Sequence, residues 1–343
     1  MNETVTGAEN GGLSREQLTE LRESLAELRT EIETRFSVRR DGRESGRVRP
    51  DLLSRGLRAG LDKLGVSGAY SGLRRMLSAY STDQRSLEVD EFGLDPFYLE
   101  RARVLLDFLY DRWWRVKVAG AENLPAEGRV LFVANRSGVL PYDGLMIAHA
   151  VERSHPSHQR PRFLAADWIG TLPFSQPLLA RLGGVRACPE NAERLLRGGH
   201  WVVTFPEGQK GALKPFRERY RLQRFARGGF VSLALRLDAT IVPVGVVGAE
   251  EVHPVLFHPT LPRRLLGFPL PVTPTFPLAG PLGLVPLPSQ WRIRFGQPLR
   301  ADDLMRGRAN DALYVNQVRD EIRNTIQSLL EEEVHRRSSV FRS

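Results

Sequence analysis

The chain has 343 residues, of which 41% are hydrophobic and 26% charged, and its formal net charge is +9. This composition is typical of a globular protein and excludes a collagen-like or fully disordered one. The single cysteine, Cys188, excludes an internal disulfide bond and gives no support to a zinc site, so we expect no bound metal. The basic charge favours nucleic acid, anionic lipid or phosphorylated ligands without choosing among them.

Residues 1–50 are predicted to form an N-terminal extension that ends in a basic linker. Its first residues are polar and acidic and lack the apolar core of a signal peptide. Ser14 and Gln17 form a capping box that starts a helix over residues 14–36. Apolar side chains recur there every three or four residues, at Leu18, Leu21, Leu25, Leu28 and Ile32. This stripe favours self-association or a partner protein, and a helix lying on its own domain explains it equally well.

Residues 51–118 are predicted to be a helical region. Asp95 caps a helix whose first turn holds Pro96 and which runs to about Trp114. The helix is rich in aromatic side chains. Such residues suit a membrane interface, although packing in a core accounts for most of them.

Residues 119–335 show strand and helix patterns that alternate. The expected strands are 130–134, 163–166, 202–205, 241–247 and 292–295, and the expected helices are 144–151, 189–196, 227–236 and 311–332. This order predicts an α/β domain with a mostly parallel central sheet flanked by helices, preceded by the N-terminal helical extension. In such sheets, functional residues gather at the carboxyl ends of strands.

An apolar stretch runs from Leu265 to Trp291 without a charged side chain, but seven prolines interrupt it. Prolines at this density exclude a single membrane-spanning helix. We expect an irregular apolar surface there, which together with Trp168 and Phe174 either enters a bilayer or covers the core.

Three polar segments directly follow expected strands. The first is the run from Asn135 to Gly144, the second ends at Arg186, and the third is Phe-Pro-Glu-Gly at 205–208, followed by Lys210. A fourth segment, 241–244, is a buried strand with an inserted proline. The order and content of these segments resemble the four motifs of the phospholipid/glycerol acyltransferase family, which includes the lysophosphatidic acid acyltransferases. Residues 90–96 and 120–125 also resemble a bacterial branch of that family, and the resemblance covers roughly residues 90–300.

The resemblance implies a glycerolipid acyltransferase-like fold and acyl transfer from acyl-CoA or acyl-carrier protein as co-substrate, with no bound cofactor. In the family, a histidine deprotonates an alcohol that attacks the thioester, and an aspartate orients this histidine. Asp143 matches the aspartate. The histidine position holds Arg136, so the resemblance assigns Arg136 and Asp143 to the catalytic position.

A guanidinium group has a pKa above ~12 and no acceptor lone pair, so Arg136 cannot act as the base. Loss of a general base costs ~10²–10⁴-fold in rate. His149 does not replace it, because six residues along a helix turn its side chain away from Asp143. We therefore expect an Arg136–Asp143 ion pair at the position of the base.

The resemblance also implies substrate-binding roles for Asn135, Ser137, Arg186, Glu207, Gly208 and Lys210. Arg186 and Lys210 match family positions that hold phosphate, although a solvated surface role is equally compatible with each. Glu207 either contacts glycerol hydroxyls or caps the turn after its strand. The arginines between 217 and 227 form a basic run that suits lipid headgroups or simply a solvated face.

The sequence therefore predicts an acyltransferase-family protein that acts on a glycerophospholipid or related lipid alcohol, with catalysis impaired by the missing base. The alternative is a non-catalytic lipid-binding or partner-binding protein of the same fold. Nucleic-acid binding ranks last, because the sequence has no motif for it. The expected location is cytoplasmic, peripheral to the inner face of the membrane.

Overall fold

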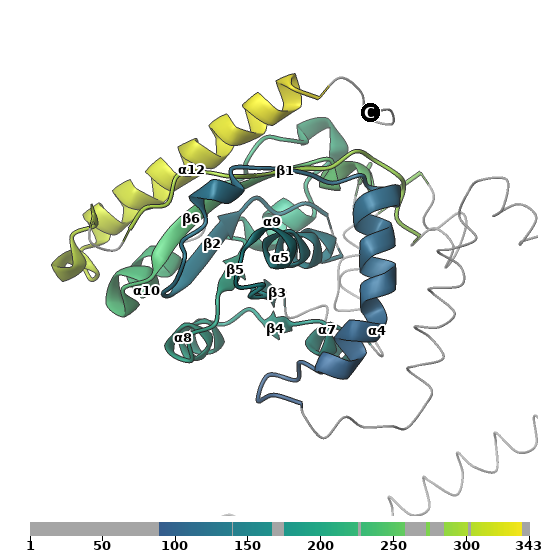
Figure 1. The fold of residues 1–343 in the computed structure, drawn as a ribbon. Coiled ribbons are helices and arrows are strands. Elements are labelled where there is room, and N and C mark those ends of the chain that lie inside the picture. Colours follow the sequence, from purple (N-terminus) through teal and green to yellow (C-terminus); the bar gives the residue numbers. More distant parts are fainter. Residues whose placement is uncertain are drawn as a thin grey trace, which may run out of the picture. The chain divides into compact units, whose positions relative to one another are not determined.

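The computed structural model describes residues 89–138, 140–166, 175–225, 228–257, 272–274, 285–300 and 303–337. The predictions for the N-terminal extension, for helix 14–36, for Trp168 and Phe174, and for most of the stretch from 265 to 291 lie outside these residues. Figure 1 shows a central sheet with helices on both of its faces.

The sheet has seven strands in the order β1-β7-β6-β2-β5-β3-β4. All neighbouring strands are parallel except β6 and β7, which are antiparallel, so the predicted mostly parallel sheet is confirmed. The strands are β1 Lys117–Ala119, β2 Val130–Ala134, β3 Arg162–Ala165, β4 Gly184–Arg186, β5 Val202–Thr204, β6 Thr240–Val247 and β7 Arg292–Phe295. The sequence did not predict β1 and β4, because each is a short segment with a single valine, whereas the equally short β5 lies in a mostly apolar run from Trp201 to Phe205.

Helices cover both faces of this sheet. One face carries α4 Pro96–Asp107, the π-helix η1 Phe108–Trp113, α5 Tyr142–Ser154 and α7 Ser175–Arg181, and the other carries α8 Pro189–Arg197, α10 Gly229–Leu237 and α12 Ala312–His335. Shorter helices in the connections are η2 Ala121–Asn123, α9 Gly208–Ala212, η3 Phe216–Glu218, η4 Ala249–Glu251 and η7 Arg306–Arg308. Across the described ranges, no helix combines the length and apolarity that crossing a bilayer requires.

Strand β2 shows why both faces need helices. Every residue of β2 is buried. Because side chains alternate along a strand, Phe132 packs into the core beneath α5, whereas Leu131 and Val133 pack into the core beneath α10 and α12. A continuously apolar strand is typical of a parallel sheet that is covered on both sides.

Helix α4 begins as the sequence predicts. The Asp95 carboxylate accepts a hydrogen bond from the backbone N–H of Tyr98 at 3.0 Å, and Pro96 occupies the first turn. The buried side of α4 shares one hydrophobic core with the strands, and Trp114 stacks on Trp291 with 4.6 Å between ring centroids. The α/β domain therefore includes α4 in its core, and its sheet begins at Lys117, two residues before the predicted boundary.

Helix α5 determines where Asp143 lies, because this residue belongs to the first turn of α5. The next residue, Gly144, packs directly on strand β3. A Cβ atom at this position would come within 2.7 Å of the Phe163 ring. Only glycine therefore allows the start of α5 to approach the sheet this closely.

We predict that Gly144→Ala lowers the free energy of unfolding by about 1–3 kcal/mol, because the added methyl group overpacks the contact with Phe163. Urea unfolding followed by tryptophan fluorescence measures the change. Gly229→Ala is the matched control: a Cβ there meets nothing within 4 Å, and the exchange should be neutral or slightly stabilising. Equal unfolding midpoints for the two variants would contradict the proposed packing constraint.

Candidate active site

The three central strands bring the predicted motifs together. Strands β6, β2 and β5 are direct neighbours and parallel, so their carboxyl ends lie at one edge of the sheet. Asn135 follows β2, Glu207 follows β5 and Glu250 follows β6. The backbone N–H of Arg136 donates to Glu207 at 2.8 Å, which joins the first and third motifs directly. The proximity that the family resemblance implies for these two segments is confirmed.

Arg136 and Asp143 form the expected ion pair. The Nη1 atom of Arg136 lies 2.7 Å from Asp143 Oδ1. Asp143 also accepts hydrogen bonds from the backbone N–H of Ser137 at 2.9 Å and of Gly144 at 2.8 Å. Burial raises the pKa of Asp143, and the Arg136 charge and these N–H groups oppose that rise. Each carboxylate oxygen of Asp143 therefore has a partner inside the protein.

The Arg136 side chain is 4% exposed. Its guanidinium carbon lies 4.9 Å from the centre of the Phe205 ring, within the range of a cation–π contact. Its Nη2 atom is also buried, and it has no hydrogen-bond partner among the described residues. The position of the family base thus holds a buried cation whose Nη1 atom is paired and whose Nη2 atom is not.

Glu207 connects three loops rather than pointing into solvent. One carboxylate oxygen accepts from the Arg136 backbone N–H, and the other accepts from the Gln223 backbone N–H at 2.7 Å. Burial raises the pKa of Glu207, and the nearby charge of Lys214 opposes that rise. In the described structure, the role of Glu207 is to hold the loops after β2 and β5 against the segment around 223.

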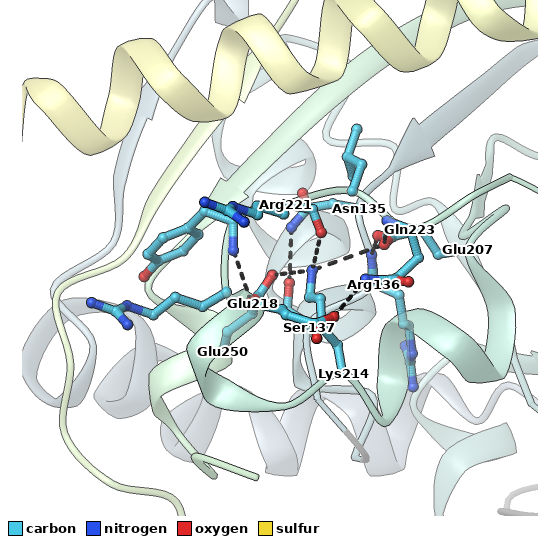
Figure 2. Close-up of polar contacts among 12 residues, drawn as sticks. Asn135, Arg136, Ser137, Glu207, Lys214, Glu218, Arg221, Gln223 and Glu250 are labelled. Atoms are coloured by element: carbon cyan, nitrogen blue, oxygen red, sulfur yellow. Dashed lines mark hydrogen bonds and ion pairs between the residues drawn. The ribbon is translucent and has the colours of Figure 1, made fainter. Parts of the chain in front are cut away.

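Lys214 lies between two buried carboxylates, as Figure 2 shows. Its ammonium nitrogen is 2.9 Å from Glu250 and 3.9 Å from Glu207, and it donates to the Arg221 carbonyl at 3.0 Å. Burial raises the pKa of Glu250 to about 7, although Lys214 opposes the rise. The Arg136 guanidinium points away from this cluster (Figure 2).

The cluster continues to the C-terminal end of α12. Tyr220 donates its backbone N–H to Glu250 at 3.0 Å and its hydroxyl to Glu251 at 2.6 Å. Glu251 in turn pairs with Arg337, which follows α12. Through Tyr220, the segment that contains Lys214 is therefore bound to the two glutamates after β6, and one of these glutamates is bound in turn to Arg337.

His149 does not replace the missing base. Its side chain is 1% exposed, and its Nε2 atom lies 2.9 Å from Asp107 at the end of α4. The ring also packs edge-on against Tyr110. His149 therefore links α5 to α4 and the π-helix, and these contacts agree with the prediction that its side chain turns away from Asp143.

The remaining predicted site residues divide into two groups. Asn135 and Ser137 are buried, and the Asn135 amide exchanges hydrogen bonds of 2.8 and 3.0 Å with the backbone of Val246. Arg186, Gly208 and Lys210 are exposed, Arg186 at the end of edge strand β4 and the other two in α9. The binding roles of these exposed residues stay predictions.

Sequence reasoning missed Lys214, Gln223 and Glu250. The acidic pair directly after β6 was a usable signal, because it follows a buried strand next to the one that carries Arg136. Lys214 and Gln223 gave no such signal, since both lie in irregular segments. Among the residues that the structure describes, no three His, Cys, Asp or Glu side chains gather in a way that would hold a metal ion.

The raised pKa of Glu250 predicts a pH dependence of stability. Its neutral form is favoured in the folded protein, so its contribution is fully present below pH 4.5 and is lost as the pH rises through about 7. The shift corresponds to about 3 kcal/mol. We expect the difference in unfolding free energy between the wild type and Glu250→Gln to decrease by this amount from pH 4.5 to 8. A constant difference across this range would contradict the assignment.

The sequence of the chain matches a family model and several known proteins. A family model described as Acyltransferase matches residues 115–247, from just before β1 to the end of β6. Uncharacterized proteins of Mycobacterium tuberculosis and Mycobacterium leprae are each 48% identical to the chain over 255 residues, which is 74% of this chain and 71% and 70% of theirs.

More distant matches also occur. Phytyl ester synthase 2 of Arabidopsis thaliana chloroplasts is 29% identical over 157 residues, covering 43% of this chain and 22% of that protein. The crystal structure of the 1-acyl-sn-glycerophosphate acyltransferase from Thermotoga maritima matches with a TM-score of 0.44 and 16% identity, covering 79% of this chain and 91% of that one. On the family model and the mycobacterial relatives, this chain belongs to the acyltransferase family that the model describes.

Proposed function

We propose that the chain is a non-catalytic member of this family that binds an acylated lipid or acyl donor at a membrane surface. The observation that supports the proposal is the buried ion pair between Arg136 and Asp143. It fills the position of the general base with a group that can only donate hydrogen bonds. Asp143, which would orient a histidine, is instead engaged by the arginine and by two backbone N–H groups.

Acyl transfer to an alcohol needs a group that removes the hydroxyl proton as the alcohol attacks the thioester. The carboxylates nearby are Asp143, Glu207 and Glu250, and each is buried and held by donors within the protein. A carboxylate that is both paired and closed off from solvent is a poor base for an incoming alcohol. The transfer rate should therefore lie ~10²–10⁴-fold below that of an enzyme with its base in place.

The features that support binding are the exposed groups around the same edge of the sheet. Lys210 and Arg186 are cationic and suit phosphate oxygens, although they lie on different elements. Family membership implies an acyl donor as co-substrate, and acyl-CoA or acyl-carrier protein fits this role. The Arabidopsis relative is named as a phytyl ester synthase, and formation of a lipid ester fits a lipid ligand for this chain. A net charge of +9 would favour an anionic membrane surface.

We predict that Arg136→His raises acyl transfer by about 100-fold or more over the wild type, because the imidazole restores a base beside Asp143. Release of free CoA from oleoyl-CoA in the presence of lysophosphatidic acid measures the rate. Arg136→Gln is the matched control, since it also breaks the ion pair but supplies no base, and its rate should remain at background.

The proposal would be overturned if the wild-type protein showed rapid acyl transfer and Asp143→Ala abolished it. The chain would then be an active acyltransferase. Failure of Arg136→His to exceed Arg136→Gln would show that the missing base is not sufficient to explain low activity.

We also predict that Lys210→Gln weakens binding to vesicles that contain phosphatidic acid by about fivefold, since one basic residue near an anionic surface contributes about 1 kcal/mol. Vesicle co-sedimentation measures the partitioning. Arg300→Gln serves as the control: Arg300 is exposed beside the amino end of β6, at the opposite edge of the sheet. Equal effects of the two exchanges would argue against a binding surface at Lys210.

A further inference from the structure

The connection between strands β6 and β7 carries apolar side chains that the core does not cover. Leu256, Phe257 and Val285 are each at least 50% exposed, and we call them the apolar patch. Their two segments are joined, because the Leu287 backbone N–H donates to the Val252 carbonyl at 3.0 Å. Large apolar side chains scattered singly over a surface are ordinary, but exposed ones gathered on one connection call for an explanation.

Leu256 and Phe257 belong to a narrow antiparallel ribbon. The Leu256 backbone N–H donates to the Val272 carbonyl, and the Val272 N–H donates to the Phe257 carbonyl, each at 2.9 Å. Successive side chains along an extended segment point to opposite faces. Because both Leu256 and Phe257 are exposed, the core covers neither face of the ribbon at this point. The ribbon therefore projects from the domain with apolar side chains on both of its faces.

The backbone beside the apolar patch is held by the folded domain. The Val255 carbonyl accepts a hydrogen bond from the Phe216 backbone N–H at 2.8 Å. The indole N–H of Trp113 donates to the Pro286 carbonyl, one residue after Val285, at 2.9 Å. A surface whose backbone is already ordered loses little conformational entropy when it binds.

Exposed arginines border the apolar patch on two sides. Arg217 and Arg219 follow Phe216, and the Arg219 guanidinium carbon lies 4.6 Å from the centre of the Phe216 ring. Arg112 directly precedes Trp113. We call these three the flanking arginines. Apolar side chains bordered by basic ones are typical of surfaces that enter the boundary of a bilayer, where the charges stay at the anionic headgroups.

Two further observations favour a bilayer as the occupant of this surface. The sequence of the same connection has no charged side chain from Leu265 to Trp291, so its apolar composition is not confined to the patch. The connection also leaves the sheet at the carboxyl end of β6, which is the edge where Arg136 lies. A membrane bound there would face the proposed lipid site.

We propose that the apolar patch enters the hydrocarbon boundary of a lipid bilayer while the flanking arginines stay at the level of the phosphates. This inference rests on the proposed function, which does not say by which surface the protein meets a membrane. It adds an apolar component to membrane binding, distinct from the attraction that the net charge and Lys210 provide.

Vesicle binding by the full chain separates insertion from attraction by charge. The probes are vesicles of phosphatidylcholine mixed with phosphatidylglycerol, and co-sedimentation measures partitioning in about 0.1 M and about 1 M salt, where the Debye length is about 10 Å and about 3 Å. Leu256→Ser and Phe257→Ser should each weaken partitioning about fivefold at both salt concentrations, because the burial of apolar area is not screened by salt.

Leu313→Ser is the matched control, because it makes the same exchange at a leucine that is 83% exposed in the first turn of α12. Arg337, which follows the other end of α12, pairs with Glu251 beside the connection. Leu313 therefore lies roughly 30 Å away along the helix. This exchange should leave partitioning unchanged, and thermal unfolding of all variants shows that each one is folded.

A fluorophore on the ribbon reports insertion directly. Cys188→Ser removes the single cysteine of the chain, and Phe257→Cys or Leu313→Cys then supplies one attachment point for the dye NBD. The emission of the dye at position 257 should rise on vesicle binding and should be quenched by lipids that carry a spin label on the acyl chain. The dye at position 313 should show neither effect.

Partitioning that Leu256→Ser and Leu313→Ser change equally, or that about 1 M salt abolishes, would overturn insertion and leave the proposed binding function in place. A dye at position 257 that acyl-chain labels do not quench would do the same. Conversion of a dimer to a monomer by Leu256→Ser, seen by size-exclusion chromatography, would make the patch an interface between copies of the chain and refute the inference. A wild-type protein that binds neither vesicles nor an acyl donor would overturn the proposed function as well.

Discussion

The ion pair between Arg136 and Asp143 is the interaction on which the rest of the site depends. Both side chains are almost completely buried, and removing one partner of such a pair typically costs 3–5 kcal/mol because the other charge remains without a partner. The pair therefore fixes the loop after β2 against the first turn of α5. It also removes the acceptor that acyl transfer requires, so one contact determines both the local structure and the proposed loss of catalysis.

A second buried cluster, formed by Glu207, Lys214 and Glu250, holds the backbone of Arg136 in place. Glu207 receives the backbone N–H of Arg136, and Lys214 balances the charge of Glu207 together with Glu250. Burial is the main cause of the rise in the pKa of Glu250 to about 7; the charge of Glu207 adds to this rise, and Lys214 opposes it. Residues that the family resemblance assigns to the substrate thus serve, in this chain, to hold three loops together. A scaffold that is so firmly held suits binding, for which a preorganised backbone is an advantage.

The predictions that held were those with a local physical cause. The strand over 130–134 was predicted with its correct bounds because five consecutive apolar residues indicate a strand that is buried on both faces. The start of α4 was predicted because the Asp95 carboxylate satisfies the first free N–H groups of that helix. The ion pair was expected because Arg136 and Asp143 occupy two positions that the motif brings into contact. Strands β1 and β4 were not predicted, since each contains a single valine and forms a strand through pairing with its neighbour, β7 or β3.

The sequence by itself determined the type of fold, the family, and the chemistry that Arg136 cannot perform, since a guanidinium group lacks an acceptor in any surroundings. Only the tertiary structure decided where the charges of the site are balanced. Lys214, Gln223 and Glu250 are distant from Arg136 along the chain, and their contacts with Glu207 or with one another exist because β6, β2 and β5 end at the same edge of the sheet. Burial, and with it the pKa of each carboxylate, depends on those long-range contacts and leaves no local pattern in the sequence.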